Sequence, residues 1–176
     1  MSKSDADRVK EFTEETYGLC PVRPIPMSKS QVLFIIRMIL GELDELACTV
    51  TSDDQERDAL IQEACNTRDR CTTYIYQDTD ELIGAQFDAL VDSWYYSLNC
   101  ASKHGVNLSR IFDLVHQANM AKRDPDTGKF LRRNDGKIIK PNGWQPPDIT
   151  AEIRRQRNPA GVSSPAIYIP TIFPSQ

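Results

Sequence analysis

The chain has 176 residues, 40% of them hydrophobic, and a formal net charge of −4. That length suits one domain with a buried core, and the acidic balance argues against a general binder of nucleic-acid polymers, which normally presents a basic face. No segment resembles a signal peptide or has the roughly 18 consecutive apolar residues of a membrane span. The five cysteines show no CxxC spacing, so neither a disulfide framework nor a zinc site is favoured. We therefore expect a cytoplasmic protein without membrane contact.

The N-terminal part of the chain predicts a short helix, a linker and then a long helix. Residues 1–27 are expected to hold an amphipathic helix over 5–16 and a linker interrupted by three prolines. Ser28 or Ser30 can cap the next helix, which should continue to about residue 48. This helix is apolar on most sides, so we expect it to be central and buried.

The next two predicted helices differ in their amphipathic character. Ser52 or Asp53 can cap a helix whose opposite face is heavily charged, and we expect this helix to be more exposed than the one before it. A longer helix is predicted over 79–103, because apolar side chains recur there at helical spacing. Gly105 follows this helix at the position where a glycine commonly ends one.

The C-terminal part changes character after its first helix. Asn107 can cap a helix over 108–123. The turn signals "DTG", "NDG" and "PNG" then predict a small hairpin with strands at 129–131 and 137–139. Residues 158–176 are rich in proline and serine yet carry several large apolar side chains, so we expect an extended tail that docks on a groove.

Two pairs of acidic residues occur at helical spacing. Glu42 and Glu45 are three residues apart, and Asp88 and Asp92 are four apart, so each pair projects from one side of its helix. Burying several carboxylates without cations costs several kcal/mol each, and a metal ion would offset that cost. With only two histidines in the chain, such a site favours Mg²⁺, with Mn²⁺ possible, over Zn²⁺. Solvated helix faces are the alternative interpretation of these carboxylates.

Four stretches carry a resemblance to a known family. They are "ELDE", "DALVDSWYY", "ASKHGVNLSRIFDLVHQANMAK" and "DGKIIKPNGWQPPDI". Together they resemble the all-α nucleoside triphosphate pyrophosphohydrolases of the MazG-like group, and more narrowly the branch related to phosphoribosyl-ATP pyrophosphohydrolase. The resemblance covers roughly residues 30–150 and implies an all-α helical bundle, which we place at 28–157 with its small hairpin.

The resemblance also implies an activity and an assembly. Members of this group hydrolyse a nucleotide between its α and β phosphates to give the monophosphate and pyrophosphate. Mg²⁺ is their usual ion, and they are commonly dimers or tetramers. We therefore expect a homodimer or homotetramer whose partner is a nucleotide substrate. The alternative is a non-catalytic nucleotide sensor or helical interaction module.

The resemblance assigns roles to individual carboxylates. Glu42 and Glu45 correspond to the ExxE pair of the family, and Asp92 to the final residue of its ExxD pair. The position three residues before Asp92 is Ala89 instead of a glutamate, so Asp88 is expected as the fourth metal ligand. Glu45 is also our candidate for the base that orients or deprotonates the attacking water, because a general base needs only hydrogen-bond reach.

The fifth helix supplies the expected contacts with substrate. Asn119 and Lys122 match an Asn and a Lys that contact the nucleotide or its phosphates in the family, although Lys122 near a helix end could simply complement the helix dipole. In the predicted hairpin, Lys137, Lys140 and Trp144 could close over the phosphates, with solvated surface lysines as the alternative. We keep these three outside the core assignment.

His116 and the aromatic run at Trp94, Tyr95 and Tyr96 have plainer interpretations. A single histidine on a helix is more often a packed residue than a catalyst. Aromatic side chains on a helix belong more often to a core than to a base-stacking site. Neither group enters the expected site.

Overall fold

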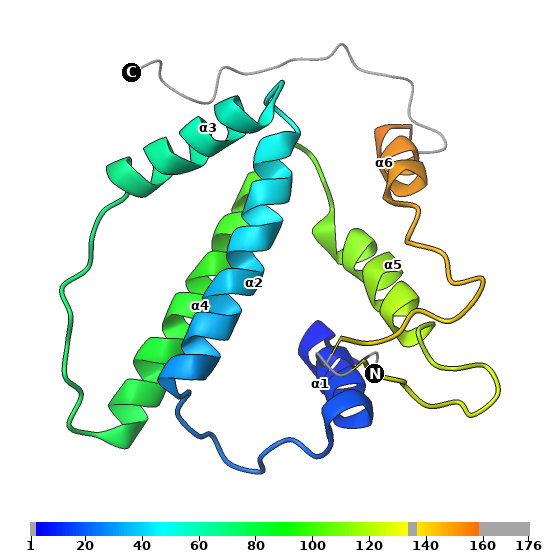
Figure 1. Cartoon of the computed structure of the whole chain (residues 1–176), viewed down its shortest axis with the longest axis horizontal. Helices are drawn as coiled ribbons and strands as arrows, with labels where there is room; N and C mark the ends of the chain where they lie inside the picture. The colour runs from blue at the N-terminus through cyan, green and yellow to red at the C-terminus, as the bar shows by residue number, and fades with distance from the viewer. Residues whose placement is uncertain (1–2, 134–136, 159–176) are drawn as a thin grey trace. The chain divides into compact units, whose positions relative to one another are not determined.

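The computed structural model describes residues 3–133 and 137–158, which form an all-α fold, as predicted (Figure 1). Its helices are α1 (Asp5–Tyr17), α2 (Lys29–Cys48), α3 (Asp54–Thr67), α4 (Thr79–Lys103), α5 (Leu108–Met120) and α6 (Ile149–Arg157). The chain divides into two compact units. We call residues 21–93 the middle unit, and the described residues up to 20 and from 94 onward the terminal unit. Helix α4 continues from one into the other.

The middle unit is organised around α2. Ser28 caps this helix and forms a reciprocal capping box with Gln31, as the sequence indicated. Just before the cap, the backbone of Met27 exchanges two hydrogen bonds with the Gln86 side chain of α4, at 2.7 and 3.0 Å. Helix α3 packs on α2 after the short turn that joins them. The start of α2 is therefore held by α4 and its end by α3.

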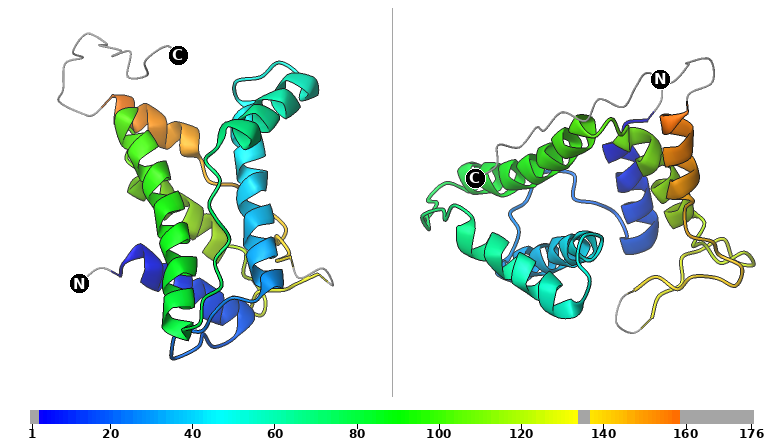
Figure 2. Two further views of the ribbon diagram at one scale, coloured as in Figure 1. Left: turned by 90° about the vertical axis from the view of Figure 1, so that its left-hand side faces the viewer. Right: turned by 90° about the horizontal axis from the view of Figure 1, so that it is seen from above.

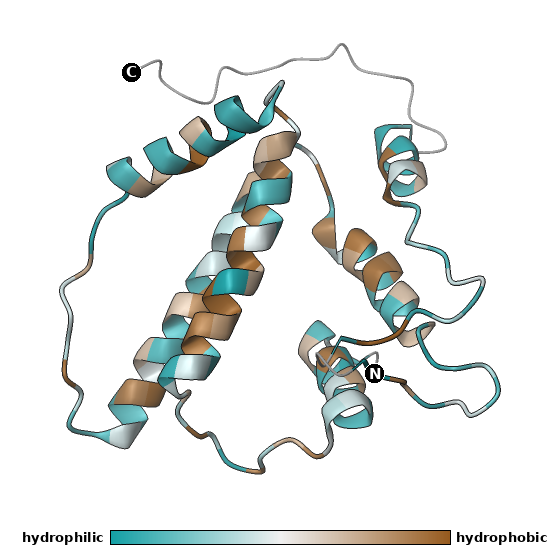
Figure 3. Cartoon of the chain, in the orientation of Figure 1, coloured by the Kyte–Doolittle hydropathy of each residue, from teal (hydrophilic) through white to brown (hydrophobic). Residues whose placement is uncertain are grey.

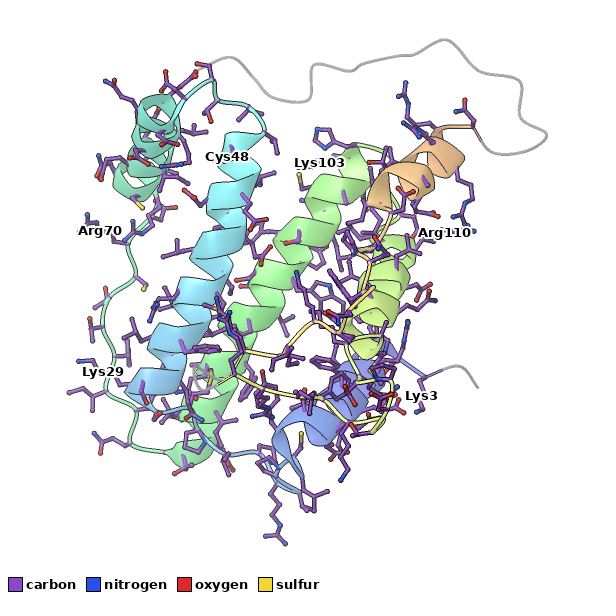
Figure 4. The ribbon with its side chains drawn as sticks, turned by 45° about the vertical axis from the view of Figure 1, so that its right-hand side comes forward. Lys3, Lys29, Cys48, Arg70, Lys103 and Arg110 are labelled. Carbon is purple, nitrogen blue, oxygen red and sulfur yellow. The ribbon has the colours of Figure 1, made fainter. Side chains whose placement is uncertain are left out.

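Helix α2 is far more exposed than its composition predicts. Along its whole length only Ala47 is buried. Leu33, Phe34 and Leu46 are 57%, 60% and 62% exposed. Figure 3 shows the apolar stretches of this helix in brown, and Figure 4 shows its side chains projecting between the labelled Lys29 and Cys48. The expectation of a buried central helix is therefore wrong for the single chain, because the middle unit supplies too few neighbours to cover an apolar helix of this length.

The terminal unit packs α1 and α6 against α5 (Figure 2). On the α1 side, Arg8 pairs with Asp113 of α5 and lies over the Phe112 ring. On the α6 side, the Gln156 side chain accepts a hydrogen bond from the backbone N–H of Asn107 at 2.7 Å and donates one back to its carbonyl oxygen. Both neighbours thus fix the position of α5, which carries Asn119, one of the two predicted substrate contacts, and is followed closely by the other, Lys122.

Three details of the C-terminal part differ from the sequence prediction. Helix α5 ends at Met120 instead of residue 123, so Lys122 lies just beyond it. Among the described residues, two isolated antiparallel bridges, Arg123 with Phe130 and Arg132 with Ile138, stand in place of the hairpin strands at 129–131 and 137–139. The described part of this segment is too short and too rich in turns to extend a ladder. Helix α6 was not predicted, although Asp148 caps it.

Two further expectations stand as follows. The predicted tail, residues 158–176, lies outside the described residues except for its first position, and the division of the chain at residues 27 and 157 stays a prediction.

None of the helices in the described ranges combines the length and the apolar character that crossing a membrane requires.

Candidate functional site

Glu42 and Glu45 lie one turn apart near the end of α2, and both side chains are exposed. Neither makes an ion pair or a side-chain hydrogen bond with any residue that the structure describes. Negative charge near the C-terminal end of a helix gains nothing from the helix dipole. The two carboxylates are therefore available as oxygen ligands for a cation.

Asp44 lies between these glutamates in sequence and behaves differently. Its carboxylate lies 3.2 Å from Nε of Arg57 on α3. Arg57 also contacts Asp58 and Asp54 at 2.8 and 2.7 Å, and the pKa of its guanidinium is raised, chiefly by the hydrogen bond to Asp58. Asp44 thus joins α2 to α3, while its two acidic neighbours remain unpaired.

Asp88 and Asp92 lie one turn apart on α4, within the middle unit, and both are exposed. As with the glutamates, no described residue pairs with either carboxylate. Ala89, at the position where the family pattern has a glutamate, contributes no donor. Each of the two helices therefore presents one free pair of carboxylates.

The structure does not gather these four carboxylates into one cluster. Over residues 3–133 and 137–158, no group of three or more His, Cys, Asp or Glu side chains is close enough to hold a metal ion. The spacing within each helix sets the two pairs, whereas the approach of one pair to the other depends on packing between α2 and α4. The metal ligand set stays a prediction.

Asn119 and Lys122 meet at the C-terminal end of α5. The Lys122 ammonium donates a hydrogen bond to Asn119 Oδ1 at 2.7 Å, and both residues are half-buried. Burial lowers the pKa of Lys122, and the nearby Lys140 lowers it further. These two predicted substrate contacts are thus adjacent and already oriented by one another.

Trp144 adds to this group, although it was not assigned to the site from the sequence. Its indole Nε1 donates a hydrogen bond to the carbonyl oxygen of Ala118 at 2.7 Å. The ammonium nitrogens of Lys122 and Lys140 lie 5.5 and 4.4 Å from the centroid of its ring. The "KPNGW" stretch was the sequence signal, since a turn at Gly143, with φ of 79°, returns the chain toward α5.

The remaining residues singled out in the sequence take no part in this group. His116 stacks on Phe112, with ring centroids 5.9 Å apart, and burial lowers its pKa, assisted by Arg8. This is the packed histidine that the sequence favoured. Trp94, Tyr95 and Tyr96 are exposed, so the expectation that they belong to a core is wrong for the single chain.

Comparison with known proteins identifies the fold. No family model matches the chain, and no curated protein matches it. Among solved structures, it is similar to a candidate NTP pyrophosphohydrolase from Exiguobacterium sp. 255-15, with a TM-score of 0.72 and 24% sequence identity over 90% of this chain and 98% of that one. The two proteins share a fold. This pyrophosphohydrolase-like fold extends over 90% of this chain and 98% of the other.

Proposed function

We propose that this protein is a nucleotide pyrophosphohydrolase that cleaves a (d)NTP or a related nucleotide between its α and β phosphates. The products would be the monophosphate and pyrophosphate. The observation that carries the proposal is the pyrophosphohydrolase-like fold, shared over 90% of the chain with the Exiguobacterium protein. Two further features support the same reaction. They are the carboxylate pairs on α2 and α4, which have no partner among the described residues, and the lysines Lys122 and Lys140 near the end of α5.

The activity would depend on Mg²⁺, with Mn²⁺ as a substitute, held by Glu42, Glu45, Asp88 and Asp92. The donor set fits such an ion by its chemistry, because all four side chains are carboxylates without another partner among the described residues, and hard cations prefer oxygen ligands. When bound, the ion would neutralise phosphate charge and polarise the phosphoanhydride. The two pairs must come together for this, which the single chain does not show.

Glu45 would act as the general base. Its carboxylate would accept a proton from water as the water oxygen attacks the α phosphorus. The bond between that phosphorus and the bridging oxygen would break, and pyrophosphate would leave with the bonding electrons. Glu42, Asp88 and Asp92 would serve mainly as ligands. Their lack of ion-pair partners leaves all three available for that role.

Asn119 and Lys122 would bind the nucleotide. Their mutual hydrogen bond of 2.7 Å orients the ammonium group, and the half-buried position of Lys122 strengthens its attraction for an anion relative to a fully solvated lysine. A phosphate oxygen could take one of the remaining protons of the ammonium. The amide of Asn119 would stay available for a second polar contact.

We also propose that the protein works as a homodimer or homotetramer in the cytoplasm. Exposed apolar side chains follow α2 and continue on α4 at Phe87 and Val91. Large exposed apolar surface typically marks a protein–protein interface. For the compartment, the support is the chemistry of the cysteines, because all five are free.

The second candidate function is a nucleotide sensor without catalysis. The observation in its favour is Ala89, which replaces the glutamate of the family pattern and removes one expected ligand. Turnover separates the two functions, because a sensor would bind nucleotide and leave it intact.

The deciding experiment incubates the wild-type protein with each common NTP and dNTP, with Mg²⁺, with Mn²⁺ and with neither, and resolves mono- and diphosphates, pyrophosphate and phosphate. We expect metal-dependent release of monophosphate and pyrophosphate, and a loss of at least about 100-fold in the Glu42→Gln variant. Asp44→Asn is the matched control, because its carboxylate pairs with Arg57 and should matter for packing alone. Binding without turnover of any nucleotide would favour the sensor.

A further inference from the structure

The terminal unit contains an apolar groove between α1, the second half of α4 and α5. Its volume is about 550 Å³, which is large enough to take several side chains of a bound segment. The apolar side chains that line it include Val9, Trp94, Leu98, Ile111, Phe112 and Val115. Among the described residues that line the groove, Asp5 and Ser109 are the polar ones. The groove therefore suits an apolar occupant.

The side chains of this groove are incompletely covered by the described part of the chain. Trp94 is 57% exposed and Val9 is 46% exposed. Along α5, which has a clear apolar face, only Ala118 is buried. Covering apolar side chains of this size removes a large area from water, and each gains free energy in proportion to that area. A further segment that packs here would supply the contacts that the described residues do not.

The described chain leaves α6 beside one end of the groove. Gln156, in the last turn of α6, exchanges hydrogen bonds of 2.7 and 3.2 Å with the backbone of Asn107. Asn107 directly precedes Leu108, which lines the groove, and Arg110, labelled in Figure 4, marks this end of α5. From Leu108 to Val115 the groove follows α5 for about 10 Å. Residues 159–176 could span roughly 60 Å if extended, so they can reach all of it.

The composition of residues 159–176 matches the groove. This stretch contains no Asp, Glu, Lys or Arg. Its large apolar side chains gather in residues 167–173, where they are Ile167, Tyr168, Ile169, Ile172 and Phe173. Pro165 and Pro170 have a fixed φ, which reduces the backbone entropy that the segment loses on binding. An uncharged apolar segment thus follows directly after the helix that ends beside an apolar groove.

We propose that residues 167–173 bind in the groove of their own chain and cover Trp94. The occupant is the same chain because the tether through α6 gives the segment an effective concentration in the millimolar range, which a second copy in dilute solution does not match. This contact is separate from the exposed apolar surface of α2, which belongs to the middle unit. It also explains why Trp94 has the apolar character of a core residue and yet is exposed among the described residues.

The test follows the indole N–H signals of the full-length, ¹⁵N-labelled protein by NMR. The chain has two tryptophans, and Trp144 lies outside the groove, where its Nε1 donates to the Ala118 carbonyl, so it serves as an internal control. We expect Ile169→Asp to reduce the bound population of the segment at least about tenfold, because a charge would have to enter the apolar groove. The Trp94 signal should shift, and the Trp144 signal should stay in place.

Two further variants make the result specific. Ser163→Asp is the matched control, since it adds the same charge to the same stretch outside residues 167–173, and both indole signals should keep their wild-type positions. Ile169→Leu should also keep them, because it preserves the apolar volume. A Trp94 signal that Ile169→Asp leaves unmoved, or that Ser163→Asp moves equally, would overturn the proposal. If the Trp144 signal shows that Ile169→Asp has altered the fold, Phe173→Asp replaces it.

A mixing experiment distinguishes the chain's own segment from that of a second copy. Labelled Ile169→Asp protein is equilibrated with an excess of unlabelled wild type. We expect the shifted Trp94 signal to persist, because each wild-type segment remains in the groove of its own chain. Recovery of the wild-type Trp94 signal would show that the segment of another copy fills the groove, and the assignment to the same chain would be wrong.

Discussion

Glu42, Asp44 and Glu45 follow one another on α2, yet only Asp44 has a cationic partner. Its position faces α3, where Arg57 already contacts two other carboxylates. Glu42 and Glu45 are exposed and have no ion-pair partner among the described residues. At the scale of single residues, therefore, the neighbour that packing supplies decides whether an acidic side chain is structural or available for chemistry.

Glu152 is the clearest example of an acidic side chain with a structural role. Its side chain is 2% exposed; it forms an ion pair with Arg155 at 2.8 Å and accepts a hydrogen bond from Gln156 at 3.0 Å. Gln156 in turn holds the backbone of Asn107 at the start of α5. We predict that Glu152→Ala lowers the free energy of unfolding by about 2 kcal/mol, because it removes the hydrogen bond and the ion pair that the buried carboxylate makes. Urea denaturation followed by circular dichroism measures this loss.

Glu152→Gln is the control for that prediction. The amide keeps the shape of the side chain and can still accept a hydrogen bond from Gln156, so the loss should be less than half of that in Glu152→Ala. Equal stability of the alanine variant and the wild type would show that the contact between α5 and α6 does not depend on this carboxylate.

The same comparison between local signal and tertiary contact applies to whole elements. The sequence predicted Ser28, Asp53 and Asn107 as candidate helix caps, and each caps its helix in the structure. This was possible because a cap needs only its own side chain and the next few backbone N–H groups. Gly105 likewise ends α4 with a φ of 70°. Local chemistry was enough for these boundaries.

Helix α6 and the hairpin segment mark the limit of local signals. The start of α6 has a cap at Asp148, but the helix is only nine residues long and depends on its packing against α5. The described part of the segment before it forms isolated bridges instead of strands. Short elements have little intrinsic stability, so tertiary contacts decide whether and how they form.

A capping interaction at α3 makes a pH prediction. Glu56 accepts hydrogen bonds from the Ser52 backbone N–H and hydroxyl at 2.7 and 2.8 Å, and these bonds lower its pKa below the ordinary 4.5. A carboxyl whose folded pKa is depressed contributes stability above its unfolded pKa and loses it as the pH falls through the folded pKa. We therefore expect Glu56→Gln to be less stable than wild type at pH 7.

The difference should shrink as the pH falls from about 4.5 through the lower pKa of folded Glu56, because the wild-type carboxyl is then protonated as well. Hydrogen exchange of the α3 amides, measured at pH 7 and in acid, reports the difference in local stability between the wild type and Glu56→Gln. A stability difference that is constant from neutral to acid pH would show that the charge of Glu56 has no part in the cap.

At the scale of the whole molecule, the dominant feature is an apolar surface that a single chain leaves open. Phe34 is 60% exposed on α2, and much of that helix is equally uncovered. We predict that Phe34→Glu shifts the protein toward the monomer by at least about tenfold in dissociation constant, because a charge would have to be buried at the interface. Light scattering coupled to size-exclusion chromatography and sedimentation equilibrium measure the shift.

Gln62→Glu is the matched control, since it makes the same change in charge on the exposed face of α3 within the same unit. Its oligomeric state should equal that of the wild type. A wild-type protein that is monomeric at all concentrations would contradict the prediction. The assembly would then have no part in covering α2.

The amino-acid sequence by itself determined the all-α fold class, the limits of most helices and the spacing of each carboxylate pair. These depend on hydrophobic periodicity and caps, which act over one or two turns of chain. Only the tertiary structure decided that α2 is exposed, that Asp44 is paired while Glu42 and Glu45 are free, and that Lys140 and Lys122 share one indole ring. Those outcomes depend on contacts between residues distant in sequence, and no local pattern specifies which distant residue will pack against a given side chain.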